Sequence, residues 1–116
     1  MDFFTITPAG ATLSAAAPAR LPADGFLWID CLLDETRAWV DDVQRLTGAA
    51  VFEDHLSDAE NTQHPSYFDS THRYEMVIFR GLAPPEDDPD QPLRVRTRPT
   101  VFFLFPGCLV VIRPAD

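Results

Sequence analysis

The sequence predicts a single α/β (α+β) domain in which a mixed, largely antiparallel sheet has helices packed on its faces. Three observations lead to this fold class. Several short apolar runs have the composition of strands, one amphipathic segment between the early runs has helical spacing, and 116 residues suit one domain spanning 1–116. Hydrophobic residues make up 46% of the chain, which is enough to build a core.

Two strands are predicted in the first third of the chain. Asp2–Thr7 is a short strand that ends at Pro8-Ala9-Gly10. Phe26–Leu32 is rich in aromatic and aliphatic residues, as strands are. Because this run is apolar almost throughout, we expect a central strand that is covered on both faces.

Three more strands are predicted in the second half of the chain. In Tyr74–Leu82 the residues Tyr74, Met76, Ile78 and Arg80 fall on one face, and the residues between them fall on the other. Thr100–Phe105 and Cys108–Arg113 form a hairpin that turns at Pro106-Gly107. Leu93–Thr97 is expected to pair as an edge strand, and the proline-rich acidic segment 83–92 to form a loop.

Two helices are predicted between the second and third strands. Asp34–Leu46 has Asp34 as its N-cap and Trp39, Val43 and Leu46 at helical spacing, so Trp39 and Leu46 should face the sheet. Thr47-Gly48 ends that helix. Ala49–Leu56 reads as a second, short helix.

Composition excludes several classes of function. The chain has 9 basic and 18 acidic residues, a net charge of -9, which disfavours binding to nucleic acid and to anionic lipid. Cys31 and Cys108 lie inside apolar runs and are expected to be buried, reduced thiols. The first residues lack the features of a secretion signal, and the longest apolar run, Val101–Ile112, is too short to span a bilayer. We therefore expect a soluble, cytoplasmic domain.

No catalytic motif is present, and we expect the chain not to be an enzyme. The sequence has no phosphate-binding glycine loop, nucleophile elbow or zinc-protease motif. His55, His64 and His72 together with Asp69 are candidates for a zinc site, but their spacing matches no standard pattern of ligands. Histidines on the surface or in loops are the simpler expectation. A small hydrolase would depend on generic carboxylates alone.

Four segments, in their order along the chain, resemble the CorA/ZntB family of divalent-cation transporters. They are Trp28-Ile29-Asp30 followed by the acidic helix entry Asp34-Glu35; Leu56–Asn61; His64-Pro65 with the strand Tyr74–Arg80; and Thr100–Phe105 with Gly107–Arg113. The resemblance covers roughly Phe26 to Arg113. Ser57 stands where the family has an acid, Gln63-His64 replaces a more basic pair, and the acidic proline-rich loop is particular to this chain.

The resemblance implies a CorA-like cytoplasmic domain that ends before a stalk helix and two membrane helices. Such domains form homopentamers at the cytoplasmic face of the bacterial inner membrane. In magnesium members, regulatory ions bind between neighbouring subunits and hold the closed state. The position that matches the family's regulatory aspartate is Asp58, so the resemblance implies Asp58 as a Mg²⁺ ligand, with Glu53, Asp54 and Glu60 as weaker candidates.

Three alternatives stay open at this stage. The family's pore signature, Gly-Met-Asn, is not in this chain, so a zinc-transporting ZntB-like member fits as well as a magnesium member. A soluble, non-enzymatic interaction module with the same fold is the alternative from another class. Ser57-x-x-Glu60 is also a capping-box pattern, which would make Asp58 merely a favourable acid in the first turn of a helix.

Overall fold

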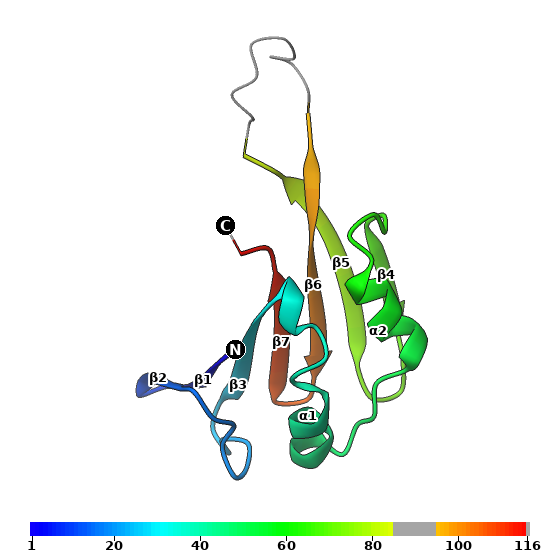
Figure 1. Cartoon of the computed structure of the whole chain (residues 1–116). Coiled ribbons are helices and arrows are strands. Elements are labelled where there is room, and N and C mark those ends of the chain that lie inside the picture. The colour runs from blue at the N-terminus through cyan, green and yellow to red at the C-terminus, as the bar shows by residue number, and fades with distance from the viewer. Residues whose placement is uncertain (85–94, 116) are drawn as a thin grey trace.

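The computed structural model describes residues 1–84 and 95–115, and its centre is a mixed sheet with helices on one side (Figure 1). The described strands lie in the order β2-β1-β3-β7-β6-β5-β4. The β3–β7 pair is parallel and the other neighbouring pairs are antiparallel. The strands are β1 Asp2–Thr7, β2 Gly10–Ser14, β3 Phe26–Leu32, β4 Tyr67–Ser70, β5 Glu75–Leu82, β6 Thr97–Phe105 and β7 Cys108–Arg113. The mixed, largely antiparallel sheet that the sequence predicts is therefore confirmed.

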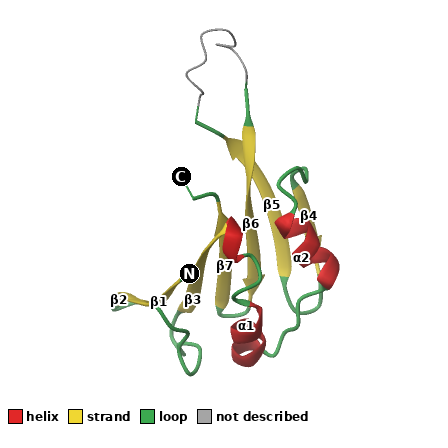
Figure 2. Cartoon of the chain, viewed as in Figure 1, coloured by secondary structure: helices red, strands yellow, loops and turns green. Residues whose placement is uncertain are grey.

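The helices are short and lie between β3 and β4 in the chain. They are the 3₁₀ turn η1, Leu33–Glu35, and the α-helices α1, Val40–Thr47, and α2, Glu53–Glu60. Figure 2 shows them on the same side of the sheet, α1 over the end of the β6–β7 hairpin and α2 beside β4 and β5. None of the helices in the described part of the chain is long and apolar enough to cross a membrane.

The hydrophobic core lies between this helical layer and one face of the sheet, the inner face. Strand register places matching residues side by side: Ile29 pairs with Val110, Val110 with Phe103, and Phe103 with Met76. All four side chains have 0% exposure. Because side chains alternate along a strand, this register puts the buried set of every central strand on one face. The alternation predicted for Tyr74–Leu82 is confirmed, since Met76 and Ile78 are buried while Phe79 is exposed.

The predicted helix Asp34–Leu46 is wrong as one continuous helix, although its burial is as expected. The chain makes the turn η1, passes through further turns, and begins α1 only at Val40. In this segment, side-chain hydrogen bonds take the place of the regular backbone hydrogen bonds of an α-helix. The Glu35 carboxylate accepts hydrogen bonds from the Leu32 N–H at 3.2 Å and the Met1 ammonium at 2.8 Å, and the Thr36 hydroxyl donates to the Leu33 carbonyl. Trp39 is fully buried against β6.

The predicted helix Ala49–Leu56 is shifted by four residues. Residues 49–52 are non-helical and α2 begins at Glu53, because the N–H of Phe52 bonds to the Tyr74 hydroxyl at 3.1 Å. The shift also removes the capping-box interpretation. Ser57 lies in the middle of α2, and Asp58 lies in its last turn, where its carbonyl accepts the N–H of Asn61.

Several smaller predictions have mixed outcomes. The β1 strand, β3 and β7 have the predicted bounds, and the β6–β7 hairpin turns at Gly107, which has a φ of 77° that suits glycine. The edge strands β2 and β4 were not predicted. Most of the expected loop 83–92, and residues 93 and 94 of the expected edge strand, lie outside the described residues. Thr97, the last residue of that expected strand, begins β6.

Only one face of β3 is covered by helices, so the prediction of cover on both faces is wrong for the described residues. Leu27, Ile29 and Cys31 are buried on the inner face. Trp28, on the opposite face, stacks on Phe4 with ring centroids 4.9 Å apart and stays partly exposed. The apolar residues of the second face are thus present in the sequence without a helical layer above them.

Both cysteines are buried and free, as predicted. Burial raises the pKa of the Cys31 thiol and of the Cys108 thiol to about 12 each. Both thiols are therefore protonated at neutral pH, which suits small apolar core residues and not reactive ones.

Candidate functional site

Asp58, the residue that the family resemblance implies as a metal ligand, lies near the C-terminal end of α2. Its carboxylate is about one-third exposed, and one oxygen lies 3.6 Å from Nε2 of His64. That separation is too long for a good hydrogen bond. A carboxylate is unfavourable at this end of a helix, because the last carbonyls carry partial negative charge. Asp58 therefore lies in a locally negative environment in which a cation is favoured.

The other acids proposed around Asp58 are already paired. The Arg37 guanidinium donates two hydrogen bonds to the Glu53 carboxylate, at 2.7 and 2.9 Å, and a further one to Glu60. The bonds from Arg37 lower the pKa of Glu53, and the two carboxylates raise the pKa of Arg37. Because Glu53 and Glu60 both form ion pairs with Arg37, their carboxylates are less available to a metal ion. Asp54 is exposed on the first turn of α2.

No described set of three or more His, Cys, Asp or Glu side chains is arranged to hold a metal ion. The zinc candidates from the sequence are scattered. His64 lies near Asp58, and the exposed His72 lies in the turn between β4 and β5. His55 and Asp69 alone are in contact. The histidine–aspartate zinc site is therefore not present in the described residues.

The structure brings together a hydrogen-bonded cluster of the buried His55 and Tyr74 with the partly exposed Asp69, and the sequence did not predict this cluster. His55 on α2 is only 6% exposed, so the expectation of a surface histidine is wrong for this residue. Its Nδ1 lies 2.6 Å from the Tyr74 hydroxyl and its Nε2 lies 2.7 Å from a carboxylate oxygen of Asp69. The cluster ties α2 to β4 and to the residue just before β5.

The hydrogen bonds of the cluster use both ring nitrogens of His55. The Tyr74 oxygen accepts the N–H of Phe52 and shares a second hydrogen bond with Nδ1 of His55. The carboxylate of Asp69 can only accept, so Nε2 of His55 carries a proton and donates it to Asp69. Hydrogen bonding from His55 lowers the pKa of Asp69, while burial raises the pKa of Tyr74. This chain of hydrogen bonds ties α2 to β4 and to the residue before β5.

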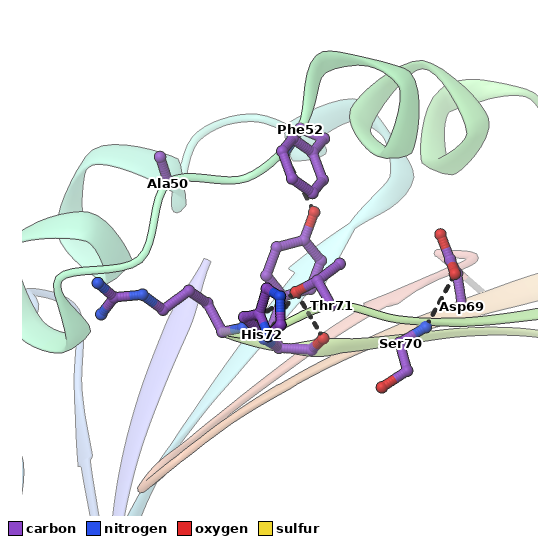
Figure 3. A pocket seen from close by; sticks show the side chains of 8 residues that line it. Ala50, Phe52, Asp69, Ser70, Thr71 and His72 are labelled. Atoms are coloured by element: carbon purple, nitrogen blue, oxygen red, sulfur yellow. Dashed lines mark hydrogen bonds between the residues drawn. The ribbon is translucent and has the colours of Figure 1, made fainter.

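An open depression of about 720 Å³ lies next to this cluster. Its walls are the linker between α1 and α2, with Ala50 and Phe52, and the turn from β4 to β5, with Thr71, His72 and Arg73. Figure 3 shows Phe52 over the turn and Asp69 and Ser70 at the strand end. Arg73 and Asp69 offset each other in charge, and the depression contains no set of groups that selects one ligand chemistry.

Asp69 should make the stability of the fold depend on pH in the acid range. Its pKa is lowered in the folded state, so the stabilisation is present above the ordinary value of about 3.9 and is lost as pH falls through the lower folded value. In urea titrations, we expect the stability difference between wild type and Asp69→Asn to shrink below about pH 4. Asp54→Asn, which alters an exposed carboxylate on α2, is the control. A difference that stays constant from pH 7 to pH 2 would contradict the pairing.

Comparison with known proteins identifies the fold. No family model matches the sequence, and no curated protein matches it. Solved structures do match. The CorA magnesium transporter from Methanocaldococcus jannaschii matches 99% of this chain with a TM-score of 0.67 and 10% identity. The ZntB cytoplasmic domain from Vibrio parahaemolyticus matches 97% of it with a TM-score of 0.63 and 15% identity.

The fold is therefore that of the cytoplasmic domains of CorA and ZntB, as the sequence resemblance implied. The soluble domain of the same CorA protein also matches, over 78% of this chain, with a TM-score of 0.54 and 15% identity. The chain spans 32% of the CorA transporter chain and 42% of the ZntB cytoplasmic-domain chain. At these identities the likeness establishes the fold, and function is inferred separately.

Proposed function

We propose that this chain is a cytoplasmic domain of a CorA-like divalent-cation transporter, with a structural and regulatory role and without enzymatic activity. The observation that carries the proposal is the match to CorA and ZntB cytoplasmic domains over nearly the whole chain, at TM-scores of 0.67 and 0.63. The four sequence segments that resemble the family point to the same class independently. The two buried thiols, whose pKa is raised to about 12, are not activated nucleophiles, which supports a non-enzymatic role.

In this proposal the domain belongs to a homopentamer at the cytoplasmic face of the bacterial inner membrane and responds to Mg²⁺ through Asp58. Support for Asp58 comes from its partly exposed carboxylate and its place at the negative end of α2. Mg²⁺ keeps most of its waters and takes one or two carboxylates, so a single aspartate is a fitting contribution to a site shared between subunits. The nearby His64 keeps a zinc-transporting member as the alternative, because imidazole suits zinc better than magnesium.

The complete gene tests the proposal at the level of class. A long helix, two apolar segments and Gly-Met-Asn encoded after Asp116 are the expected result. A stop codon directly after Asp116 would remove the transporter proposal. The soluble interaction module would then be favoured, because the second face of the sheet is rich in partly exposed apolar side chains.

Mg²⁺ binding by residues 1–116 alone should be weak. One carboxylate competes poorly with the hydration of Mg²⁺, so we expect a Kd in the millimolar range or weaker, about -4 kcal/mol or less favourable. Titration calorimetry with Mg²⁺ and with Zn²⁺, on wild type and Asp58→Asn, measures this. Asp54→Asn on the same helix is the matched control.

Two outcomes would change the proposal for the ion. Micromolar binding of Mg²⁺ by the isolated chain would mean that a complete site exists here and that the ligands have been misplaced. In the full-length protein, Asp58→Ala should weaken closure at high Mg²⁺ and leave the fold intact, because the Asp58 carboxylate is partly exposed and has a close ionisable neighbour, His64, at 3.6 Å. Unchanged closure in that variant would exclude Asp58 as the regulatory ligand.

A further inference from the structure

The imidazole ring of His64 has a defined orientation beside Asp58. His64 lies in the segment between α2 and β4, and its side chain is only 18% exposed. Its Nδ1 lies 2.9 Å from the carbonyl oxygen of Pro65. A carbonyl oxygen can only accept, so Nδ1 carries a proton and donates it to Pro65. In the neutral ring the other nitrogen, Nε2, then keeps its lone pair.

Nε2 of His64 and the carboxylate of Asp58 meet as two acceptors. Nε2 is the ring nitrogen next to Asp58, 3.6 Å from one carboxylate oxygen. A proton shared between the two atoms would hold them at about 2.7–3.0 Å, the length of a hydrogen bond. A metal ion bound to both atoms would keep them farther apart than a proton does, as observed here.

The separation of the two atoms suits zinc better than magnesium. Zinc binds imidazole nitrogen and carboxylate oxygen at about 2.0–2.2 Å with tetrahedral angles, which places two ligand atoms about 3.4 Å apart. Neighbouring ligands of octahedral Mg²⁺, at about 2.0–2.1 Å from the ion, lie only about 2.9 Å apart. The 3.6 Å between Asp58 and His64 is therefore within about 0.2 Å of the separation that zinc requires.

The hydrogen bond from Nδ1 to Pro65 is of the kind that metal-binding histidines make. Such histidines donate their second ring N–H to a backbone carbonyl or a carboxylate, which fixes the tautomer and the direction of the ring. The His64 ring also packs against Tyr67, with ring centroids 5.3 Å apart. Both contacts hold Nε2 toward Asp58 without an ion.

Arg80 on β5 holds the backbone on either side of this ring. Its Nη1 donates to the carbonyl of Thr62 at 2.8 Å and to that of His64 at 3.0 Å. Its Nε and Nη2 donate to the hydroxyl and the carbonyl of Thr97, at the start of β6. The N–H of His64 donates to the carbonyl of Asn61. The segment is thus fixed to the sheet in advance, so an ion that binds His64 has little conformational entropy to overcome.

We infer that Asp58 and His64 form a two-residue zinc site, with Nε2 of His64 and one carboxylate oxygen of Asp58 as the ligands. Among the described residues no third His, Cys, Asp or Glu completes the set. Zinc takes four ligands, so the other positions are open to water or to a group from outside the described residues. The inference deepens the role of Asp58 in the proposed function and rests on that proposal for its regulatory meaning. The binding itself is a property of the described residues.

Titration of Zn²⁺ into the 116-residue chain at pH 7 tests the pair. We expect a Kd on the order of 10–100 micromolar, because two ligands bind zinc less tightly than a complete site. His64→Ala and Asp58→Asn should each weaken binding at least about tenfold. His72→Ala is the matched control, because His72 is an exposed histidine in the β4–β5 turn, and its Kd should stay within about twofold of wild type. Millimolar Mg²⁺ should not displace the zinc, because imidazole suits zinc better than magnesium.

Nitrogen NMR of the histidine rings needs no substitution. Before zinc is added, the neutral ring of His64 should carry its proton on Nδ1, and zinc should then shift the Nε2 signal of His64 and leave that of His72 in place. Zinc binding that His64→Ala leaves unchanged would overturn the inference, and so would a proton on Nε2 of the neutral ring. Either result would leave the transporter class standing, since the complete gene decides that question. A stop codon directly after Asp116 would in turn leave the zinc titration valid.

Discussion

Replacing Trp39 by alanine should lower the free energy of unfolding by about 3–5 kcal/mol, the cost of removing a large aromatic side chain from a packed core. Trp39 has 0% exposure. Its ring centroid lies 4.9 Å from that of Phe103 and 6.2 Å from that of Phe105, so it joins the helical layer to β6. For a domain with a total stability of about 5–15 kcal/mol, this loss removes a large share of the folded population.

Two further substitutions serve as comparisons for Trp39→Ala: a conservative change at the same position and a control outside the core. Trp39→Phe should cost only about 1 kcal/mol, because it keeps an aromatic ring and removes an indole N–H that has no hydrogen-bond partner. Leu82→Ala is the control for a large apolar residue outside the core, since Leu82 is 77% exposed, and its effect should stay within about 0.5 kcal/mol.

Urea denaturation at one fixed protein concentration measures all three variants, so that the free energies of unfolding are compared under the same conditions. The slope of the transition should be the same in each variant, which indicates that the same surface is exposed on unfolding. A loss below about 1 kcal/mol for Trp39→Ala would contradict the packing of Trp39 against the sheet.

The central strands can be predicted from the sequence because the alternation of buried and exposed residues is visible within each strand itself. In β5 the alternation of Met76 and Ile78 with Val77 and Phe79 already separates the two faces, and the structure agrees with it. The edge strands lack such a signal. All five residues of β2 are exposed, and its strand state comes from pairing with β1 across the turn after Thr7. The four-residue strand β4 is likewise defined by its pairing with β5.

The helix boundaries show where tertiary contacts override local pattern. Asp34–Leu46 has helical spacing, yet the Glu35 carboxylate is bound to the chain's own amino terminus, 34 residues away. Phe52 is held out of α2 by the hydroxyl of Tyr74, which is 22 residues away. Neither contact can be seen in a window of a dozen residues, so the first helix was predicted too long and the second too early.

The same reason explains why the His55, Asp69 and Tyr74 cluster was not predicted. These residues are separated by 14 and 19 positions, and only the β4–β5 register, with Asp69 opposite Met76, turns Asp69 toward α2. Asp69 follows Phe68 in the sequence, so in a strand the two side chains lie on opposite faces. This alternation places Asp69 on the helical side only once β4 is known to be a strand that pairs with β5.

The cluster should be the most strongly coupled polar interaction in the described part of the chain, and a double-mutant cycle measures the coupling. Tyr74→Phe removes the hydroxyl that accepts the N–H of Phe52 and is hydrogen-bonded to Nδ1 of His55. It should cost about 1–3 kcal/mol, because buried polar groups are left without partners. His55→Ala should cost about 2–4 kcal/mol, since it removes buried packing as well as two hydrogen bonds.

The double variant should lose less stability than the two single losses combined, by about 1 kcal/mol or more, because each single change already breaks the bond between Tyr74 and His55. Tyr74→Phe combined with Asp30→Asn is the control cycle. Asp30 bonds to Arg113 and shares no partner with Tyr74, so the two changes should be additive within about 0.5 kcal/mol. Urea titrations at pH 7 measure both cycles. If the His55 and Tyr74 changes are additive as well, the two side chains contribute independently, and the cluster does not act as a lock between α2 and the sheet.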